Sequence, residues 1–222
     1  KSVIRLAHIT SYLLHPLFIL LYNSLLLMCL KPHWFGIHHV KEAVLLILLV
    51  LIYTIIIPII GILLLRFIGL IKTIHLEDKM DRIAPLIICI VFYLWLYINL
   101  KQNPDMPKAF LSLILGSIIS LCLAFVINNW VKVSLHTIAI GGLICFWLII
   151  RYYFCTDDIM YFRFKETEVS RFHIHQLLGI SLILGGWIGT SRLYLKAHTS
   201  EEIYLGYVIG IISIIIAFKY MY

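Results

Sequence analysis

The chain has 222 residues, of which 62% are hydrophobic and only 13% are charged, whereas ordinary soluble domains carry about 25% charged residues. Its mean hydropathy of +1.01 indicates an integral membrane protein and argues against a soluble one, and the length is enough for one such domain. The formal charge of +7 favours anionic lipid headgroups or phosphorylated substrates, and the absence of a basic tract with interleaved aromatic residues argues against a nucleic-acid partner.

Apolar runs of roughly 20 residues are long enough to cross a bilayer as helices. Runs of about this length cover residues 9–30, 43–65, 84–100, 108–128, 136–153, 174–190 and 203–219. The run at 84–100 is short for a crossing. No repeat, low-complexity tract or linker divides the sequence. It therefore predicts an all-α integral membrane protein with one domain over residues 1–222, a bundle of six or seven transmembrane helices.

Counting crossings brings three polar segments to one side of the membrane. These segments are residues 72–82, 132–136 and 192–202. The other side is predicted to carry residues 31–41, 101–108 and the long loop 151–171. Each side has nine Lys or Arg residues. If three of those on the first side serve a site, six remain there against nine on the second side. Because cytoplasmic loops carry an excess of Lys and Arg, this difference places the second side in the cytoplasm. We therefore expect a protein of the cell (inner) membrane with its site on the non-cytoplasmic face.

The last of these segments contains the most informative spacing in the sequence. His198 follows Arg192 after six residues, and Glu202 follows His198 after four. Because positions i and i+4 share one face of a helix, Glu202 is expected to hold a ring nitrogen of His198. The Arg192 guanidinium can bind an anion beside that ring. The segment therefore predicts an oriented nucleophile next to an anion-binding group.

The other two segments carry partial motifs, Lys79-Met80-Asp81-Arg82-Ile83-Ala84-Pro85 and Val133-Ser134-Leu135-His136. In order, the three segments resemble the signature of the type 2 phosphatidic acid phosphatase superfamily, the lipid phosphate phosphatases and their haloperoxidase relatives. That signature reads K-x6-R-P, then P-S-G-H, then S-R-x5-H-x3-D. The resemblance covers roughly residues 72–210.

The match is closest in the third motif, where Ser191, Arg192 and His198 agree and Glu202 replaces the aspartate. The second motif keeps the serine and the histidine but lacks the proline and the glycine. The first is loose, because His75 stands seven residues before the arginine in place of lysine.

The resemblance implies a phosphatase acting on a lipid phosphate monoester or pyrophosphate. His198 would attack phosphorus and form a phosphohistidine, Glu202 would orient its ring, and His136 would protonate the leaving lipid oxygen. The implied phosphate-binding residues are Arg192, Arg82, Lys79 and Ser134. The scheme needs no metal and no cofactor. The implied partners are a phosphorylated lipid substrate and membrane lipids, and nothing indicates a protein partner.

Two other functions are compatible with the same residues. A catalytically weak or inactive relative would bind phosphorylated lipid headgroups, because Leu135 replaces a glycine that lets backbone amides approach phosphate closely. A haem or metal protein is suggested by the ten histidines, which include His38, His39, His173 and His175.

The individual residues also have simpler explanations. Arg192 and Lys196 would serve as snorkelling anchors at a helix end. Glu202 would complement the positive end of a helix dipole, and Lys79 with Arg82 would form a solvated helical turn.

Overall fold

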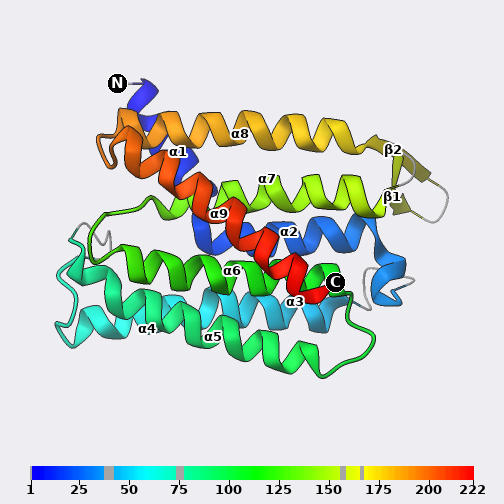
Figure 1. Ribbon diagram of the computed structural model, residues 1–222, viewed down its shortest axis with the longest axis horizontal. Helices are drawn as coiled ribbons and strands as arrows, with labels where there is room; N and C mark the ends of the chain where they lie inside the picture. The colour runs from blue at the N-terminus through cyan, green and yellow to red at the C-terminus, as the bar shows by residue number, and fades with distance from the viewer. Residues whose placement is uncertain (1, 38–42, 74–77, 156–158, 166–167) are drawn as a thin grey trace.

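The computed structural model describes residues 2–37, 43–73, 78–155, 159–165 and 168–222. Within these residues, six helices are long and apolar enough to cross a membrane, and a bent pair of shorter helices provides a seventh candidate span. The predicted fold, a helical integral membrane bundle, is confirmed (Figure 1).

The first span is broken near its middle. Helix α1 (Ser2–Leu13) and helix α2 (Pro16–Leu30) meet at an angle of 58°. The break falls at His15, whose backbone is extended because the following Pro16 disfavours a helical conformation before it. Pro16 itself fits the first turn of α2, where its missing N–H costs no hydrogen bond. The sequence predicted one run over 9–30, and the structure divides it at this X-Pro step.

The remaining spans match the predicted runs to within a few residues. α3 (Val44–Leu51) and α4 (Ile57–Phe67) join through a π-helical turn at Ile52–Ile56 and form one span. The others are α5 (Ile83–Lys101), α6 (Lys108–Ile127), α7 (Leu135–Phe154), α8 (Ile174–Tyr194) and α9 (Ser200–Met221). The short run at 84–100 thus forms a helix of 19 residues.

A β-hairpin connects α7 to α8 in the segment that the sequence predicted to be a loop. Its strands, β1 (Ile159–Lys165) and β2 (Glu168–His173), are antiparallel, with Ile159 opposite His173. The aromatic and β-branched residues in both strands explain why the segment pairs.

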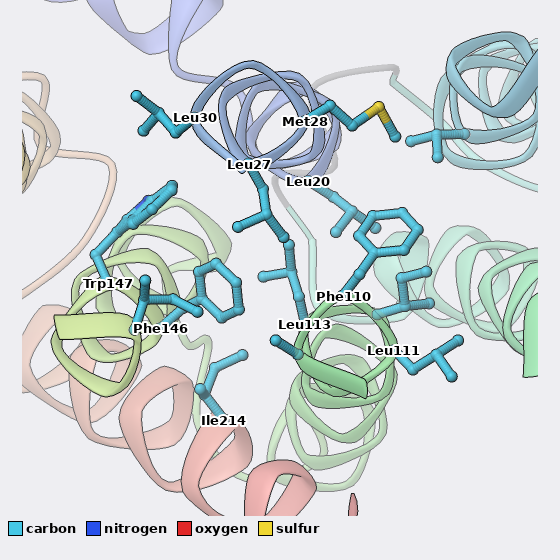
Figure 2. Packing of buried hydrophobic residues seen from close by; sticks show 14 of the residues in the cluster. Leu20, Leu27, Met28, Leu30, Phe110, Leu111, Leu113, Phe146, Trp147 and Ile214 are labelled. Carbon is cyan, nitrogen blue, oxygen red and sulfur yellow. The ribbon is translucent and has the colours of Figure 1, made fainter. Parts of the chain in front are cut away.

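The main hydrophobic core lies between α2, α6, α7 and α9. Figure 2 shows Leu27, Phe110, Phe146 and Trp147 filling the space between these helices. The one polar group on Trp147 is satisfied, since Nε1 donates to Asn23 Oδ1 at 2.8 Å. A large side chain can therefore be fully buried at membrane depth.

Helices α7 and α9 approach closely through glycines. A Cβ on Gly210 would collide with the Ile138 carbonyl oxygen, and one on Gly141 would lie 2.6 Å from the Tyr207 carbonyl oxygen. Small residues allow such backbone contact between membrane helices. The contact brings the N-termini of both helices together, where Ser134 N donates to Glu202 O at 3.4 Å.

The helix ends fall into two groups at opposite ends of the bundle. The N-termini of α5, α7 and α9 and the C-terminal end of α8 lie at one end, and the hairpin and the last residues of α9 lie at the other (Figure 1). The described parts of the three polar segments thus meet at one end of the bundle, as the count of crossings predicted.

Candidate active site at the helix ends

The backbone carbonyls of residues 132–133, which precede α7, accept hydrogen bonds from the other two polar segments. The carbonyl of Lys132 accepts a hydrogen bond from His198 Nδ1 at 3.1 Å, and the carbonyl of Val133 accepts one from an Arg82 guanidinium nitrogen at 2.9 Å. Residues far apart in the sequence, from the starts of α5 and α9, are therefore fixed on one short connection.

The turn between α8 and α9 places His198 beside Arg192. Lys196 has a left-handed conformation with φ of 53°, its N–H bonds to Leu193 O at 2.9 Å, and Ala197 N bonds to Arg192 O at 3.1 Å. These two bonds form a Schellman motif, which usually has glycine at the left-handed position. Because the turn reverses the direction of the backbone, a separation of six residues becomes proximity in space.

A capping box positions Glu202 at the start of α9. Glu202 N donates to Thr199 Oγ1 at 3.4 Å, and Thr199 N donates to Glu202 Oε2 at 3.3 Å. The same Oε2 accepts a hydrogen bond from His198 Nδ1 at 2.8 Å. One carboxylate therefore stabilises the helix start and orients the histidine ring.

The hydrogen bonds of His198 determine its tautomer. Nδ1 faces two oxygens that can only accept, so Nδ1 carries the proton and Nε2 holds a lone pair. Burial is the main cause that lowers the pKa of His198, to about 4; Glu202 opposes this shift, and the charges of Arg82 and Arg192 add to it. The ring is therefore neutral at pH 7, and its contact with Glu202 is a hydrogen bond and not an ion pair.

A cavity of about 730 Å³ opens beside this ring, a size typical of ligand-binding pockets. Its polar end is lined by cations and histidines and, among the described residues, by no carboxylate. The residues are His8, His15, Arg82, Lys132, His136, Arg192, Lys196 and His198. Such a lining attracts an anion, since positive groups in a restricted site act with little screening.

Of the cations at the polar end of the cavity, Arg192 is the one whose guanidinium is most available to a ligand. Within the residues that the structure describes, its guanidinium has no hydrogen-bond or ion-pair partner, and its Nε is buried without one. A buried polar group without a partner requires an explanation. An anion bound in the cavity would satisfy this guanidinium with the paired geometry that arginine offers to phosphate.

His136 lines the same cavity one turn into α7. Its Nε2 lies 3.0 Å from the carbonyl oxygen of Ser11 and must donate to it. Nδ1 is therefore the nitrogen that remains for a ligand. The ring of His15 stands 5.5 Å from that of His136 at an interplanar angle of 82°. Because Nδ1 of His15 accepts from Leu17 N at 3.4 Å, its Nε2 carries the proton.

Two predicted site residues do not reach the cavity. Lys79 is exposed, and its Nζ donates to the carbonyl of Trp130. Ser134 is fully buried as the residue before α7, and its Oγ has no partner among the described residues. The structure thus brings together Arg82, His136, Arg192 and His198, with Glu202 behind His198. Lys79 and Ser134 support this arrangement from outside the cavity.

The sequence interpretation missed Lys132 and His15 as cavity residues. Lys132 could have been found because it lies in the second polar segment, four residues before His136. His15 precedes a proline inside an apolar run, and this pairing marks a helix break with a polar side chain at membrane depth.

Among the described residues, no group of three His, Cys, Asp or Glu side chains could hold a metal ion. His38, His39 and His75 lie outside the described residues. His173 caps the N-terminus of α8, at the end of the bundle opposite His198.

No protein-family model matches the sequence, and neither does a curated protein or a solved structure. The fold and the site define an integral membrane helical bundle with a cationic, histidine-lined cavity at one end.

Proposed function

We propose that the protein is a membrane phosphatase that hydrolyses a lipid phosphate monoester or pyrophosphate through a phosphohistidine on His198. One observation supports this most strongly: His198 is a neutral imidazole whose protonated Nδ1 is held by Glu202, while its other nitrogen is left for a cavity that Arg82 and Arg192 line. A neutral, oriented imidazole beside arginines is the arrangement that nucleophilic attack on a phosphate requires.

In the first step, the lone pair of His198 Nε2 attacks phosphorus and the bond from phosphorus to the leaving oxygen breaks. Glu202 stabilises the positive charge that develops on the ring. His136 can donate its Nδ1 proton to the leaving oxygen only when it is protonated on both nitrogens, since Nε2–H bonds to Ser11, and the negative charge of the phosphate bound beside it would favour that state.

In the second step, water attacks the phosphohistidine and the bond from phosphorus to nitrogen breaks. His136 Nδ1, now without its proton, accepts one from the attacking water, so both histidines return to their starting states. Arg82 and Arg192 neutralise the phosphoryl oxygens in both steps. Lys79 and Ser134 act indirectly, by holding the connection before α7 in place.

A headgroup-binding protein without turnover is the second candidate function. The buried Ser134 hydroxyl and the outward Lys79 favour it, because a site with fewer phosphate donors binds an anion without closing around a transition state. For either function, we propose that the site faces the non-cytoplasmic side of the cell (inner) membrane, from the count of Lys and Arg residues.

The test is phosphate release by the detergent-purified protein from a panel of lipid monophosphates and pyrophosphates. We expect turnover by the wild-type protein and none by His198→Ala. His33→Ala is the matched control, because His33 is exposed at the other end of the bundle. Equal turnover by a folded His198→Ala protein would exclude the phosphohistidine. Binding of lipid phosphate without release by the wild-type protein would favour the second candidate.

A further inference from the structure

The cavity beside His198 extends deep into the apolar part of the bundle. Its lining includes Arg82, the residue before α5, and Leu86, Cys89 and Tyr93 on α5, which follow at intervals of four, three and four residues and so form one stripe along the helix. Tyr93 follows Arg82 by eleven residues, which at about 1.5 Å per residue is roughly 16 Å along the axis. The polar end is therefore only the mouth of a chamber.

Three polar residues deep in the chamber, Asn23, Tyr93 and Ser117, direct their hydrogen-bonding groups to other parts of the protein. Asn23 donates to Ile19 O at 2.9 Å and accepts from Trp147 at 2.8 Å. Tyr93 donates its hydroxyl proton to Thr54 O, and Ser117 donates to Leu113 O at 2.9 Å. Because these groups use their hydrogen-bonding capacity within the protein, they offer little to a polar ligand or to water.

The floor of the chamber is closed by the hydrophobic core. Leu20, Leu113 and Ile214 belong to the chamber lining and also to the core cluster, where they pack between α2, α6 and α9 (Figure 2). The chamber is thus cationic at one end and closed by aliphatic side chains at the other. Its complement is a molecule with an anionic head and an apolar tail.

The volume limits the tail. The chamber's volume of about 730 Å³ lies within the range of roughly 300–1,000 Å³ that is typical of a pocket for one small ligand. A pocket of this size fits a phosphate with one long hydrocarbon tail better than a lipid with two.

We propose that this chamber is a binding site for the hydrocarbon tail of a single-chain lipid phosphate, with the tail inside the bundle between α2, α5, α6 and α7. The phosphate headgroup in this proposal is inferred from the phosphatase function proposed above. The single tail is inferred from the shape and lining of the chamber. The substrate class is then a phosphate or pyrophosphate of one long aliphatic or isoprenoid alcohol, or a phospholipid with one acyl group.

The test compares phosphate release from para-nitrophenyl phosphate, dodecyl phosphate, hexadecyl phosphate and a phosphatidate with two hexadecanoyl tails. For the wild-type protein we expect kcat/KM to rise with the length of a single tail, by up to about fourfold per methylene group until the chamber is full. The two-tailed phosphatidate should be a poorer substrate than hexadecyl phosphate. Turnover independent of tail length, or a preference for two tails, would overturn the proposal.

Two variants change the chamber without touching its polar end. Ser117→Phe narrows it at mid-depth and should lower kcat/KM for hexadecyl phosphate by on the order of 10–100-fold, which corresponds to a few methylene groups left outside. It should leave para-nitrophenyl phosphate unchanged. Leu86→Ala enlarges the chamber and should move the optimum to longer tails. The control is Val126→Phe, on the exposed side of the same helix as Ser117. An equal loss on both substrates in Ser117→Phe would contradict a tail site.

Failure of the phosphatase proposal gives a different result. If the wild-type protein releases no phosphate from any substrate, equilibrium binding of radiolabelled hexadecyl phosphate in nanodiscs decides the question. Binding that Ser117→Phe weakens and Val126→Phe does not would retain the tail site and reject the catalysis. No binding by the wild-type protein would reject both.

Discussion

Glu202 Oε2 lies 2.8 Å from His198 Nδ1 while the same oxygen accepts the N–H of Thr199 at 3.3 Å. The sequence offered two explanations of Glu202, as the partner of a nucleophile and as a charge at a helix N-terminus. The structure combines them, because the capping box fixes the carboxylate at the position where it meets the imidazole. The stability of α9 and the tautomer of His198 thus depend on one side chain.

This double role can be separated by substitution. Glu202→Gln keeps an oxygen for the capping box but loses the negative charge behind His198, so we expect turnover to fall by on the order of 10²–10⁴-fold with little change in Tm. Glu202→Ala removes the capping interaction as well and should destabilise the protein by about 1 kcal/mol. Steady-state kinetics and thermal unfolding measure the two effects. Glu201→Gln, an exposed neighbour, is the control and should match the wild type.

The pKa of His198 predicts how activity and stability depend on pH. The ordinary value of 6.5 is lowered to about 4 in the folded protein, chiefly by burial. The nucleophile therefore stays neutral in mildly acidic solution, and the ascending limb of kcat/KM that belongs to it should lie near pH 4 and not near 6.5. In Glu202→Gln this limb should move to lower pH, since Glu202 raises the pKa. If the ascending limb of kcat/KM assigned to His198 lay near pH 6.5, the buried, neutral state of this ring would be contradicted.

The same pKa has a consequence for unfolding. Between pH 6.5 and about 4 the unfolded protein binds a proton at this position and the folded protein does not. The contribution of His198 to stability is therefore complete above pH 6.5 and decreases as the pH falls towards 4. Comparing Tm against pH for the wild type and His198→Ala isolates this contribution, and a difference that does not change with pH would disprove it.

The helical fold was largely predictable from the sequence, because a bilayer imposes one simple condition on every span. Each run of apolar residues had to be long enough to cross the bilayer, and the number of crossings between two loops determined whether they lie on the same side of the membrane. This is how the segments with Arg82, His136 and His198 were expected at one end. The break at His15 and the hairpin at Ile159–Lys165 depend on local backbone preferences that hydropathy does not report.

The cavity was much harder to predict than the helices. Whether a polar residue lines it depends on the rotation of each helix about its axis. Lys79 and Arg82 are three residues apart at the start of α5, yet only Arg82 reaches the cavity. The apolar chamber has no motif at all, since its walls are ordinary Leu, Ile and Ser residues whose common feature is the space between them.

The glycine contact between α7 and α9 holds the site together and can be tested alone. In Gly210→Ala, the new methyl group would collide with the carbonyl oxygen of Ile138, so the helices must separate, at a cost of typically about 1–3 kcal/mol. Gly186→Ala on α8 meets no atom within 4 Å and should be neutral or slightly stabilising. Thermal unfolding in detergent compares the two. Equal Tm values would show that the close contact is unimportant.

Activity should not depend on a divalent metal ion. The cavity already carries Arg82, Lys132, Arg192 and Lys196, whose fixed charges can neutralise a phosphoryl group as Mg²⁺ does in kinases. No carboxylate lines the cavity among the described residues to hold such an ion, and Glu202 bonds to His198. Turnover should therefore survive EDTA. If EDTA abolished turnover and added Mg²⁺ restored it, the proposal that Arg82 and Arg192 neutralise the phosphoryl group without a metal would be contradicted.

Vanadate, which mimics the transition state of phosphoryl transfer, tests whether His198, Arg82 and Arg192 surround the phosphoryl group. Vanadium becomes five-coordinate in a trigonal bipyramid, with three oxygens in the equatorial plane and the nucleophile at one apex. His198 Nε2 and the two arginines should therefore bind vanadate, and it should inhibit turnover. Arg192→Lys keeps the charge but loses the planar guanidinium with its paired donors, and should weaken inhibition on the order of tenfold or more. Arg66→Lys makes the same change at an exposed position outside the cavity and should be inhibited like the wild type. Equal inhibition of all three proteins would show that Arg192 does not contact the phosphoryl group.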